Sequence, residues 1–379
     1  MTFPDFAWAV GEESSDPISI KDGGTVRVDE LAQSGHLARQ DDDLADVAAL
    51  GVRVLRYGMP WRLSEPEPGR YDWTLWDTAL ASCERHGIEP VVDLCHFGLP
   101  DHLPGFADPT WVDAFLRYFE AFLDRYPLVR WFTPVNEPMT VALLSARYGV
   151  WNDRLTSDED YAHVLALCTL ANLEAHARLV ADRGGWSIGA EAIGVPLTAG
   201  GDDAMRLRLA LERAPWDLQF GKPLDPLAEP AFAAVSDEVR GRIDALATNE
   251  HVISGHDCYP ISIIDMPGDV EAILDAYEAW ATKWYARYAT PFWVAETSNL
   301  GLDVDRQSEW LDAFVARLAK MRADGLPVRG LCWYSRGDQF DWQTALIEPS
   351  GALTEVGLFT QDRVARPVAA RFAEHVRTT

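Results

Sequence analysis

Lysine is scarce in this 379-residue chain: only four of its 33 basic residues are Lys, against 59 acidic residues. The formal net charge is −26, which repels the phosphates of nucleic acids and an anionic membrane surface. We therefore expect neither nucleic acid nor membrane as a partner. A salt-tolerant surface fits this composition, and an Arg-rich coding bias combined with ordinary solubility explains it more simply.

Cysteine is also rare, and no two cysteines form a C-x-x-C pair. The five are odd in number and scattered, and several lie in apolar, strand-like runs: Cys83, Cys95, Cys168, Cys258 and Cys332. This pattern predicts buried free thiols in a reducing compartment and gives no sign of a disulfide framework.

Targeting and membrane signals are lacking as well. The first residues, Met-Thr-Phe-Pro-Asp, contain neither a basic region nor an apolar stretch of the kind found in signal peptides. No apolar run in the sequence approaches the roughly 18 to 20 residues of a membrane span. We expect a cytoplasmic protein. The oligomeric state cannot be read from the sequence.

Hydrophobic residues, in contrast, are plentiful. They make up 48% of the chain, and aromatics 11%, with fifteen Trp. These values are typical of a globular protein with a large core. Most of the Trp side chains are expected in that core, although aromatic planes also suit the apolar faces of sugar rings.

Apolar runs alternate with helical patterns along the whole chain. The runs do not alternate polar with apolar residues, which is typical of parallel strands covered by helices. The eight predicted strands are 6–10, 52–57, 88–94, 129–136, 187–193, 251–257, 291–296 and 328–335. Predicted helices lie between them, near 40–50, 73–86, 109–125, 161–182, 202–213, 235–247, 268–288 and 306–323, with a last helix near 364–376.

Eight such units in a chain of this size favour an α/β fold, the (β/α)8 or TIM barrel. A doubly wound open sheet is the alternative, and it usually has a Gly-rich phosphate turn after its first strand. The stretch Val10-Gly11-Glu12-Glu13 is no such turn. No repeat or linker divides the chain, so we expect residues 1–379 to form a single catalytic domain.

Catalytic groups of a TIM barrel lie at the C-terminal ends of its strands. In this sequence, ionisable, amide or aromatic side chains occur at nearly every predicted strand end: Glu12 or Glu13, Arg56, His96, Asn136, Glu137, Glu191, Asp257, Tyr259, Glu296, Trp333 and Arg336. The roles of Glu12, Glu13, Glu191 and Arg336 stay open at this point.

Two of these strand ends share one design. Apolar runs end in Asn136-Glu137-Pro138 after the fourth strand and in Glu296 after the seventh. These ends face each other across a closed barrel, so the two carboxylates can converge on one bond. Two carboxylates on either side of a glycosidic linkage form the machinery of glycoside hydrolysis, provided that one holds a proton while the other is ionised.

Four segments resemble the family 1 β-glycosidases, in the clan of (β/α)8 retaining glycosidases. They are His96-Phe97-Gly98-Leu99-Pro100; Thr133-Pro134-Val135-Asn136-Glu137-Pro138, which resembles the acid/base motif; Val294-Ala295-Glu296-Thr297-Ser298-Asn299, which resembles the nucleophile motif; and Trp333-Tyr334-Ser335 with Asp338-Gln339-Phe340-Asp341-Trp342, which resembles the sugar-binding segment of the last strand. The segments span most of the chain in the order that the family has.

The resemblance implies a retaining double displacement without a metal or cofactor. Glu296 is then the catalytic nucleophile, and Glu137 the catalytic acid and base. The resemblance also implies substrate-binding residues: Arg56 and Tyr259 as partners of the nucleophile, Asn136 at the 2-hydroxyl, and His96, Trp333, Asp341 and Trp342 at other hydroxyls and ring faces. The implied activity is that of an exo-acting, β-glucosidase-like hydrolase of a small β-glycoside or a short oligosaccharide.

Several positions depart from the family pattern. Glu stands after the first strand where Gln is usual, Thr297-Ser298 replaces Asn-Gly after the nucleophile, and Asp341 replaces Glu. Because of these changes, a second interpretation stays open: another member of the clan, with a different sugar specificity or with endo action.

Two other functions remain as alternatives. The first is a catalytically silent sugar-binding barrel, which would require that one of the two carboxylates be missing. The second is a metal-dependent hydrolase or isomerase built on His96, His102, His251, His256 and Asp257. No H-x-H or H-E-x-x-H spacing supports the second.

Overall fold

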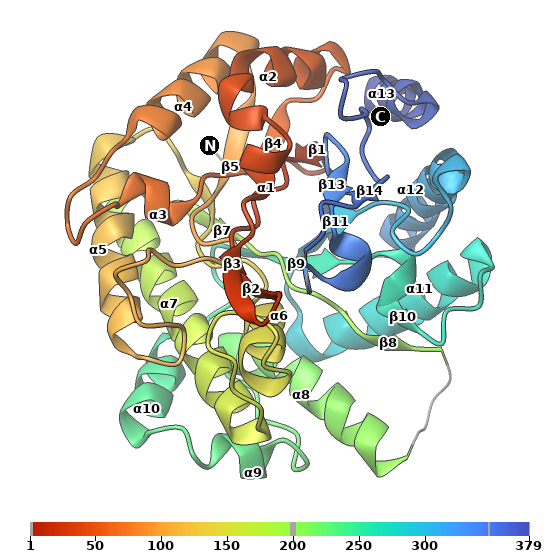
Figure 1. Ribbon diagram of the computed structural model, residues 1–379. Helices are drawn as coiled ribbons and strands as arrows, with labels where there is room; N and C mark the ends of the chain where they lie inside the picture. Colours follow the sequence, from red (N-terminus) through yellow and green to blue (C-terminus); the bar gives the residue numbers. More distant parts are fainter. Residues whose placement is uncertain (1–2, 198–201, 348, 379) are drawn as a thin grey trace.

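A closed barrel of eight parallel strands forms the centre of the computed structural model, which describes residues 3–197, 202–347 and 349–378 (Figure 1). Around the barrel the strands pair in the order β1-β12-β11-β9-β7-β6-β5-β4. Their bounds are β1 (Ala7–Gly11), β4 (Val54–Gly58), β5 (Glu89–Asp93), β6 (Trp131–Thr133), β7 (Trp186–Ile188), β9 (Val252–Asp257), β11 (Phe292–Thr297) and β12 (Val328–Tyr334). The predicted (β/α)8 fold is thereby confirmed.

Helices form the outer layer of the molecule (Figure 1). The longer ones are α2 (Gln40–Ala49), α4 (Thr74–His86), α5 (Thr110–Arg125), α7 (Asp158–Arg183), α8 (Asp203–Gln219), α10 (Asp237–Leu246), α11 (Val270–Tyr288), α12 (Gln307–Ala323) and α13 (Pro367–Thr378). The short ones are α1 (Glu30–Gln33), α3 (Trp61–Ser64), α6 (Pro138–Ala142) and α9 (Glu229–Phe232), with a π-helical turn, η2 (Leu143–Arg147), after α6.

Glycines end two of these helices. Gly87 follows α4 with φ 64°, and Gly184 follows α7 with φ 58°. Only a residue without a Cβ adopts this left-handed conformation at little cost, which lets the chain turn from the helix into the next strand.

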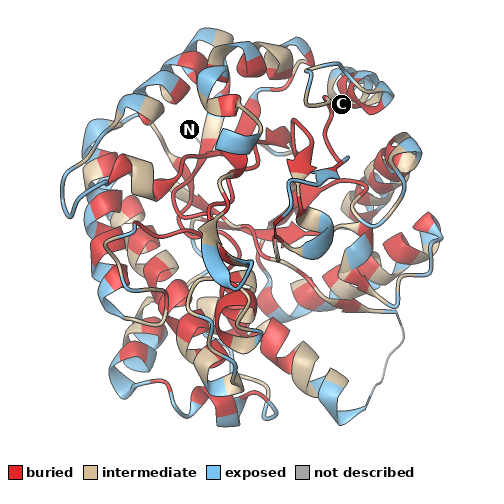
Figure 2. Ribbon diagram, viewed as in Figure 1, coloured by how far each residue is buried: buried red, intermediate tan, exposed pale blue. Residues whose placement is uncertain are grey.

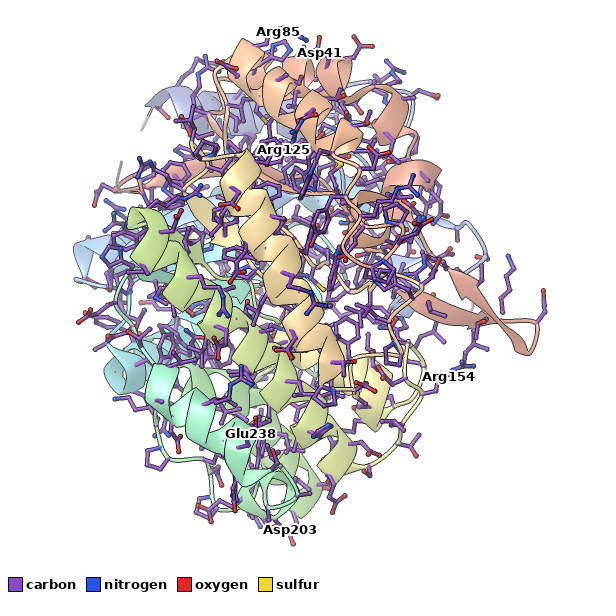
Figure 3. The ribbon with its side chains drawn as sticks, turned by 90° about the vertical axis from the view of Figure 1, so that its left-hand side faces the viewer. Asp41, Arg85, Arg125, Arg154, Asp203 and Glu238 are labelled. Atoms are coloured by element: carbon purple, nitrogen blue, oxygen red, sulfur yellow. The ribbon has the colours of Figure 1, made fainter. Side chains whose placement is uncertain are left out.

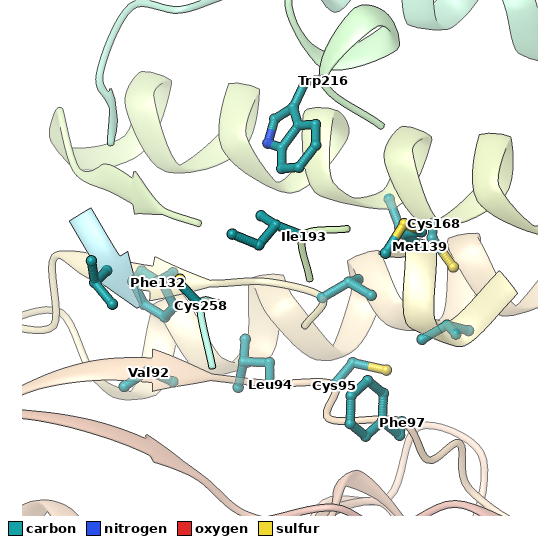
Figure 4. Packing of buried hydrophobic residues seen from close by; sticks show 14 of the residues in the cluster. Val92, Leu94, Cys95, Phe97, Phe132, Met139, Cys168, Ile193, Trp216 and Cys258 are labelled. Carbon is teal, nitrogen blue, oxygen red and sulfur yellow. The ribbon is translucent and has the colours of Figure 1, made fainter. Parts of the chain in front are cut away.

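Apolar side chains form two layers, one on each face of the strands. The smaller layer fills the barrel and includes Trp131, Trp293 and Cys332. The larger one lies between strands and helices, and Figure 4 shows part of it, with Val92 of β5 and Phe132 of β6 in the same layer as Trp216 of α8. Burial on both faces explains why the strands read as continuous apolar runs. In Figure 2 the buried residues accordingly concentrate in the barrel and on the inner sides of the helices.

Helix α7 is, by length and composition alone, long and apolar enough to cross a membrane. Two thirds of its apolar window, 67%, is buried inside the fold. It packs against α5, α10 and α6, so its apolar residues belong to the core between the helices.

Two hairpins lie in front of the barrel in Figure 1 and were not expected from the sequence. One pairs β2 (Ile18–Lys21) with β3 (Gly24–Arg27), and the other pairs β13 (Gln339–Phe340) with β14 (Leu353–Thr354). A further small sheet pairs β8 (Val195–Pro196) with β10 (Ile263–Ile264). The hairpins follow β1 and β12, so they stand at the same end of the barrel as the predicted catalytic groups.

Charged side chains cover the helical surface, as in the side view of Figure 3. Arginine frequently pairs there with the abundant carboxylates, as Arg85 does with Asp41, both labelled in the figure. All five cysteines are free and buried, as predicted.

Candidate active site

The fourth strand delivers Glu137 to the barrel mouth through a sharp change of backbone direction. The strand β6 ends at Thr133, earlier than predicted, because Pro134 has no N–H to continue the ladder. Glu137 has φ 39° and ψ 66°, and Pro138 begins helix α6 directly after it. Its backbone N–H donates to Ala190 O over 3.1 Å. The backbone of Glu137 is therefore fixed between Ala190 and the start of helix α6.

The seventh strand places Glu296 opposite, beside the end of β9. The pairing of β11 with β9 is irregular between Val294 and Glu296, and Glu296 pairs with Asp257 after that irregularity. Trp293 and Ala295 point into the barrel. The extra residue of the irregularity brings the side chain of Glu296 to the same interior, although strict alternation would turn it outward.

Arg56 joins two of the predicted residues and one further carboxylate. Its guanidinium donates to Glu296 Oε1 and to Asn136 Oδ1, and over 2.6 Å to Asp93 Oδ2. Tyr259 Oη donates to the other carboxylate oxygen of Glu296 over 2.7 Å. Both oxygens of Glu296 thus accept a hydrogen bond, one of them from a cation, and such contacts favour the ionised carboxylate.

The two glutamates lie close together and are nearly enclosed. Oxygens of the two carboxyls lie within 4.8 Å of each other, and Glu137 and Glu296 are 7% and 5% exposed. Burial, followed by the charge of Glu296, raises the pKa of Glu137 to about 7. One carboxyl is therefore prepared to carry a proton near neutral pH while its partner is held by hydrogen-bond donors.

His96 and Asn136 extend the site at the ends of the third and fourth strands, respectively. His96 Nε2 lies 3.1 Å from Asn136 Nδ2, and His96 Nδ1 lies 2.8 Å from Asp93 Oδ2. Burial opposes charge on the imidazole, but Asp93 and Glu13 together raise the pKa of His96. Asp93 was missed in the sequence, although it ends an apolar strand on the same face as Val91, which lies inside the barrel.

Glu13 belongs to the same pocket, where the family usually has Gln. Its carboxyl accepts hydrogen bonds from the backbone N–H and the hydroxyl of Ser15, and it lies 3.8 Å from His96 Nε2. Burial raises the pKa of Glu13.

The last strand presents a different aromatic residue than expected. Trp333 is fully buried in the layer between strands and helices, and its indole donates to Val356 O over 3.0 Å. Tyr334 points into the barrel instead, with its ring parallel to His96 and 5.3 Å from the guanidinium carbon of Arg56. Counting by twos from Cys332, also inside the barrel, identifies Tyr334 as the residue facing the site. The predicted sugar contact of Trp333 is not supported by this geometry.

Asp341 and Trp342 begin the turn after β13. Both carboxylate oxygens of Asp341 accept hydrogen bonds within their own loop, from Ser350 Oγ and from the N–H groups of Gly351 and Ala352. These contacts fix the carboxylate of Asp341, and its predicted contact with sugar hydroxyls stays a prediction. Trp342 packs against Phe97, next to His96, and its buried indole N–H has no hydrogen-bond acceptor among the described residues. Its predicted contact with a sugar is compatible with this position.

The histidines that a metal-dependent hydrolase or isomerase would use as ligands do not lie together. His251 precedes β9 at the opposite end of the barrel and contacts Gly185 O, while His256 faces outward against Phe292. Of that set, His96 and Asp257 lie at the site. Among the described residues, one group of side chains has its oxygens close enough together to hold a metal ion. It consists of Glu137, Asp257 and Glu296.

Glu12 and Arg336, whose roles the sequence leaves open, form a buried ion pair. Arg336 Nη2 lies 3.0 Å from both Glu12 Oε1 and Asp43 Oδ2. Glu191 lies next to Glu137 and accepts hydrogen bonds from the backbone N–H groups of Met139 and Ala192. These residues support the site and do not enter it as free charges.

Comparison with known proteins agrees with this architecture. Residues 23–191 match the family model described as glycosyl hydrolase family 1. The aryl-phospho-beta-D-glucosidase BglA of Bacillus subtilis is 33% identical over 109 residues, which cover 26% of this chain and 23% of the relative. Beta-glucosidase A of Thermotoga maritima is 31% identical over 178 residues, covering 44% of this chain and 37% of the relative.

A solved structure resembles the whole chain. The family 1 β-glucosidase from Thermotoga maritima superimposes with a TM-score of 0.83 at 17% identity, covering 99% of this chain and 98% of the other. The sequence matches span less than two fifths of the curated relatives named above. The chain therefore has the (β/α)8 barrel fold of this glucosidase. Residues 23–191, less than half of the chain, resemble glycosyl hydrolase family 1.

Proposed function

We propose that the protein is a retaining, exo-acting β-glycosidase that hydrolyses a small β-glycoside or a short oligosaccharide. The observation that carries this proposal is the spacing of Glu137 and Glu296, whose carboxyl oxygens lie within 4.8 Å. Carboxyls about 5–5.5 Å apart are typical of retaining enzymes, whereas inverting ones need roughly 6.5–9.5 Å to admit a water.

In the first step, Glu296 attacks the anomeric carbon while Glu137 donates its proton to the leaving oxygen. In the second step, Glu137 takes a proton from water, and the water displaces Glu296 from the glycosyl-enzyme. Arg56 and Tyr259 hold the nucleophile in its ionised, oriented form. Asn136, held by Arg56, presents its amide to the sugar's 2-hydroxyl.

The charges around the glycone favour an unphosphorylated sugar. Several relatives are described as phospho-glycosidases, among them the 6-phospho-beta-glucosidase AscB of Escherichia coli. In this chain, the carboxyls of Glu13, Glu137 and Glu296 gather in the pocket, and the guanidinium of Arg336 is neutralised by two carboxylates. A sugar phosphate entering here meets repulsion and no free cation among the residues described above.

The test is a panel of aryl β-glycosides: glucoside, galactoside, mannoside, fucoside, xyloside and arabinoside, with the 6-phospho forms of the first two. We expect turnover of at least one neutral glycoside, at a kcat/KM well above that of any 6-phospho form. Glu296→Gly should abolish this turnover, and azide or formate should restore it. Full activity of that variant, or a preference for phosphorylated sugars, contradicts the respective part of the proposal.

The panel also tests a clan member with a different sugar, and oligosaccharides of increasing length test endo action. A silent sugar-binding barrel is disfavoured because both carboxyls are present and close. We further propose that residues 1–379 act as one catalytic domain with no cofactor, in the cytoplasm, which the free buried thiols support.

A further inference from the structure

A third carboxyl, that of Asp257, lies close to the two proposed catalytic glutamates and has no role in the mechanism above. Asp257 is the last residue of β9, and one of its oxygens lies within 4.8 Å of oxygens of both Glu137 and Glu296. It pairs with Glu296 across the two strands. The side chain is 1% exposed.

Asp257 lacks every contact that would stabilise a negative charge. Neither of its carboxyl oxygens receives a hydrogen bond among the described residues. Arg56, the nearest cation in the site, is already bound to Glu296, Asp93 and Asn136. An ionised carboxylate that is buried without donors or a paired cation is very costly, so such a group keeps its proton.

The charges of Glu296 and Glu137 act in the same direction as burial, and the charge of Arg56 opposes them. Titratable or charged groups approach it from the ends of the neighbouring strands and from its own: Arg56, Asp93, His96, Glu137, Glu191, Tyr259, Glu296 and Tyr334. Burial, then the charges of Glu296 and Glu137, raises the pKa of Asp257.

We propose that Asp257 is a neutral carboxylic acid that donates its proton in a hydrogen bond to Glu137 and so positions the acid/base carboxyl. This inference rests on the proposed function for its catalytic meaning, although the protonation state itself does not. Oxygens of the two carboxyls lie within 4.8 Å, and Glu296 already accepts from Arg56 and Tyr259. Glu137 is therefore the acceptor in need of a donor.

The hydrogen bond serves both steps of the reaction. After Glu137 has given its proton to the leaving oxygen, its carboxylate is left in a buried site beside few donors. Asp257 stabilises that carboxylate and fixes its orientation toward the incoming water. No net proton is transferred from Asp257, which ends each cycle as it began.

The test uses the full-length protein and compares two replacements of Asp257. In Asp257→Asn the amide keeps a neutral donor, so the basic limb of kcat/KM should stay within a few tenths of a pH unit of the wild type. In Asp257→Ala the donor is lost, and the limb should move to higher pH by about one to two units, because a hydrogen bond that favours the ionised Glu137 has gone. Asp257→Val carries the same expectation if the Ala variant does not fold.

Two outcomes overturn the proposal. A shift of the Asp257→Asn limb to lower pH shows that Asp257 is charged in the wild type, since the amide would then remove a negative neighbour. An Asp257→Ala limb equal to that of the wild type shows that no hydrogen bond is made.

A second readout does not depend on activity. In protein labelled with carbon-13 at the aspartate carboxyls, the signal that disappears in Asp257→Asn should have the shift of a protonated carboxyl at pH 7, and a carboxylate shift overturns the proposal. If the wild type hydrolyses no glycoside of the panel, the proposed function fails by itself, and this spectrum still decides the state of Asp257.

Discussion

Glu137 combines a buried carboxyl with a backbone that turns it out of its strand. Its pKa of about 7, raised by burial and by Glu296, determines the direction in which kcat/KM changes with pH. The proton that the leaving group needs is present below this pH and is lost as the pH rises through it. We therefore expect kcat/KM to fall with a basic limb near pH 7, measured on an aryl glycoside with a poor leaving group.

Glu137→Ala should lose far more activity on substrates with poor leaving groups than on activated aryl glycosides, because good leaving groups need no proton. The losses are measured as kcat/KM over a series of leaving-group pKa values, with the wild type as control. Equal losses along the series would remove Glu137 as the acid.

At this scale the sequence predicted the central residues but not their surroundings. Glu137, Glu296, Arg56, Asn136, His96 and Tyr259 come together as expected. Trp333 does not, because the face of a strand on which a side chain lies is set by neighbours that a motif does not contain. Tyr334 follows from parity, once the inward face of β12 is known.

The backbone of β9 comes very close to Gly189, the residue after β7. A Cβ on Gly255 of β9 would lie 2.0 Å from the backbone oxygen of Gly189, which no side-chain movement can relieve. Gly255→Ala should therefore lower the free energy of unfolding by about 1–3 kcal/mol or more. Gly241, inside helix α10, faces open space, and Gly241→Ala should raise it by about 0.5–1 kcal/mol.

Urea unfolding followed by circular dichroism measures both variants against the wild type. Similar effects of the two substitutions would show that the close approach of β9 to Gly189 is not a constraint on the fold.

The succession of elements was predicted well because each strand is buried on both faces and each helix is amphipathic or glycine-terminated. The errors lie where the chain leaves this pattern. Pro134 shortens β6 within an apolar run, and the β2–β3 hairpin turns at Asp22-Gly23 in a short segment with little apolar periodicity. Asp22 and Gly23 both have positive φ, the conformation that two-residue hairpin turns require.

The molecule as a whole encloses many carboxyls and carries a formal charge of −26. Burial raises the pKa of Asp16 to about 7 and that of Glu30 to about 9. Such groups ionise more readily in the unfolded chain. Between the unfolded and the folded pKa of each group, the folded state therefore binds more protons. Their contribution to stability is present below about pH 4 and is lost as the pH rises through the folded pKa.

We accordingly expect the free energy of unfolding to be lower at pH 8 than at pH 5, as measured by urea denaturation at constant ionic strength. In Glu30→Gln the side chain cannot titrate but can still accept from Phe340 N–H, so this variant should show a flatter dependence. A free energy that rises from pH 5 to pH 8 in the wild type would contradict this reading of the buried carboxyls.

The stereochemistry of hydrolysis tests the pairing of Glu137 with Glu296 most directly. Proton NMR is recorded during the first minutes of hydrolysis of the best aryl β-glycoside of the panel, before the free sugar mutarotates. If Glu296 is the nucleophile and the two carboxyls act at their observed spacing, the β-anomer appears first and the α-anomer only later. An α-anomer released first would mean that water, and not Glu296, attacks the anomeric carbon.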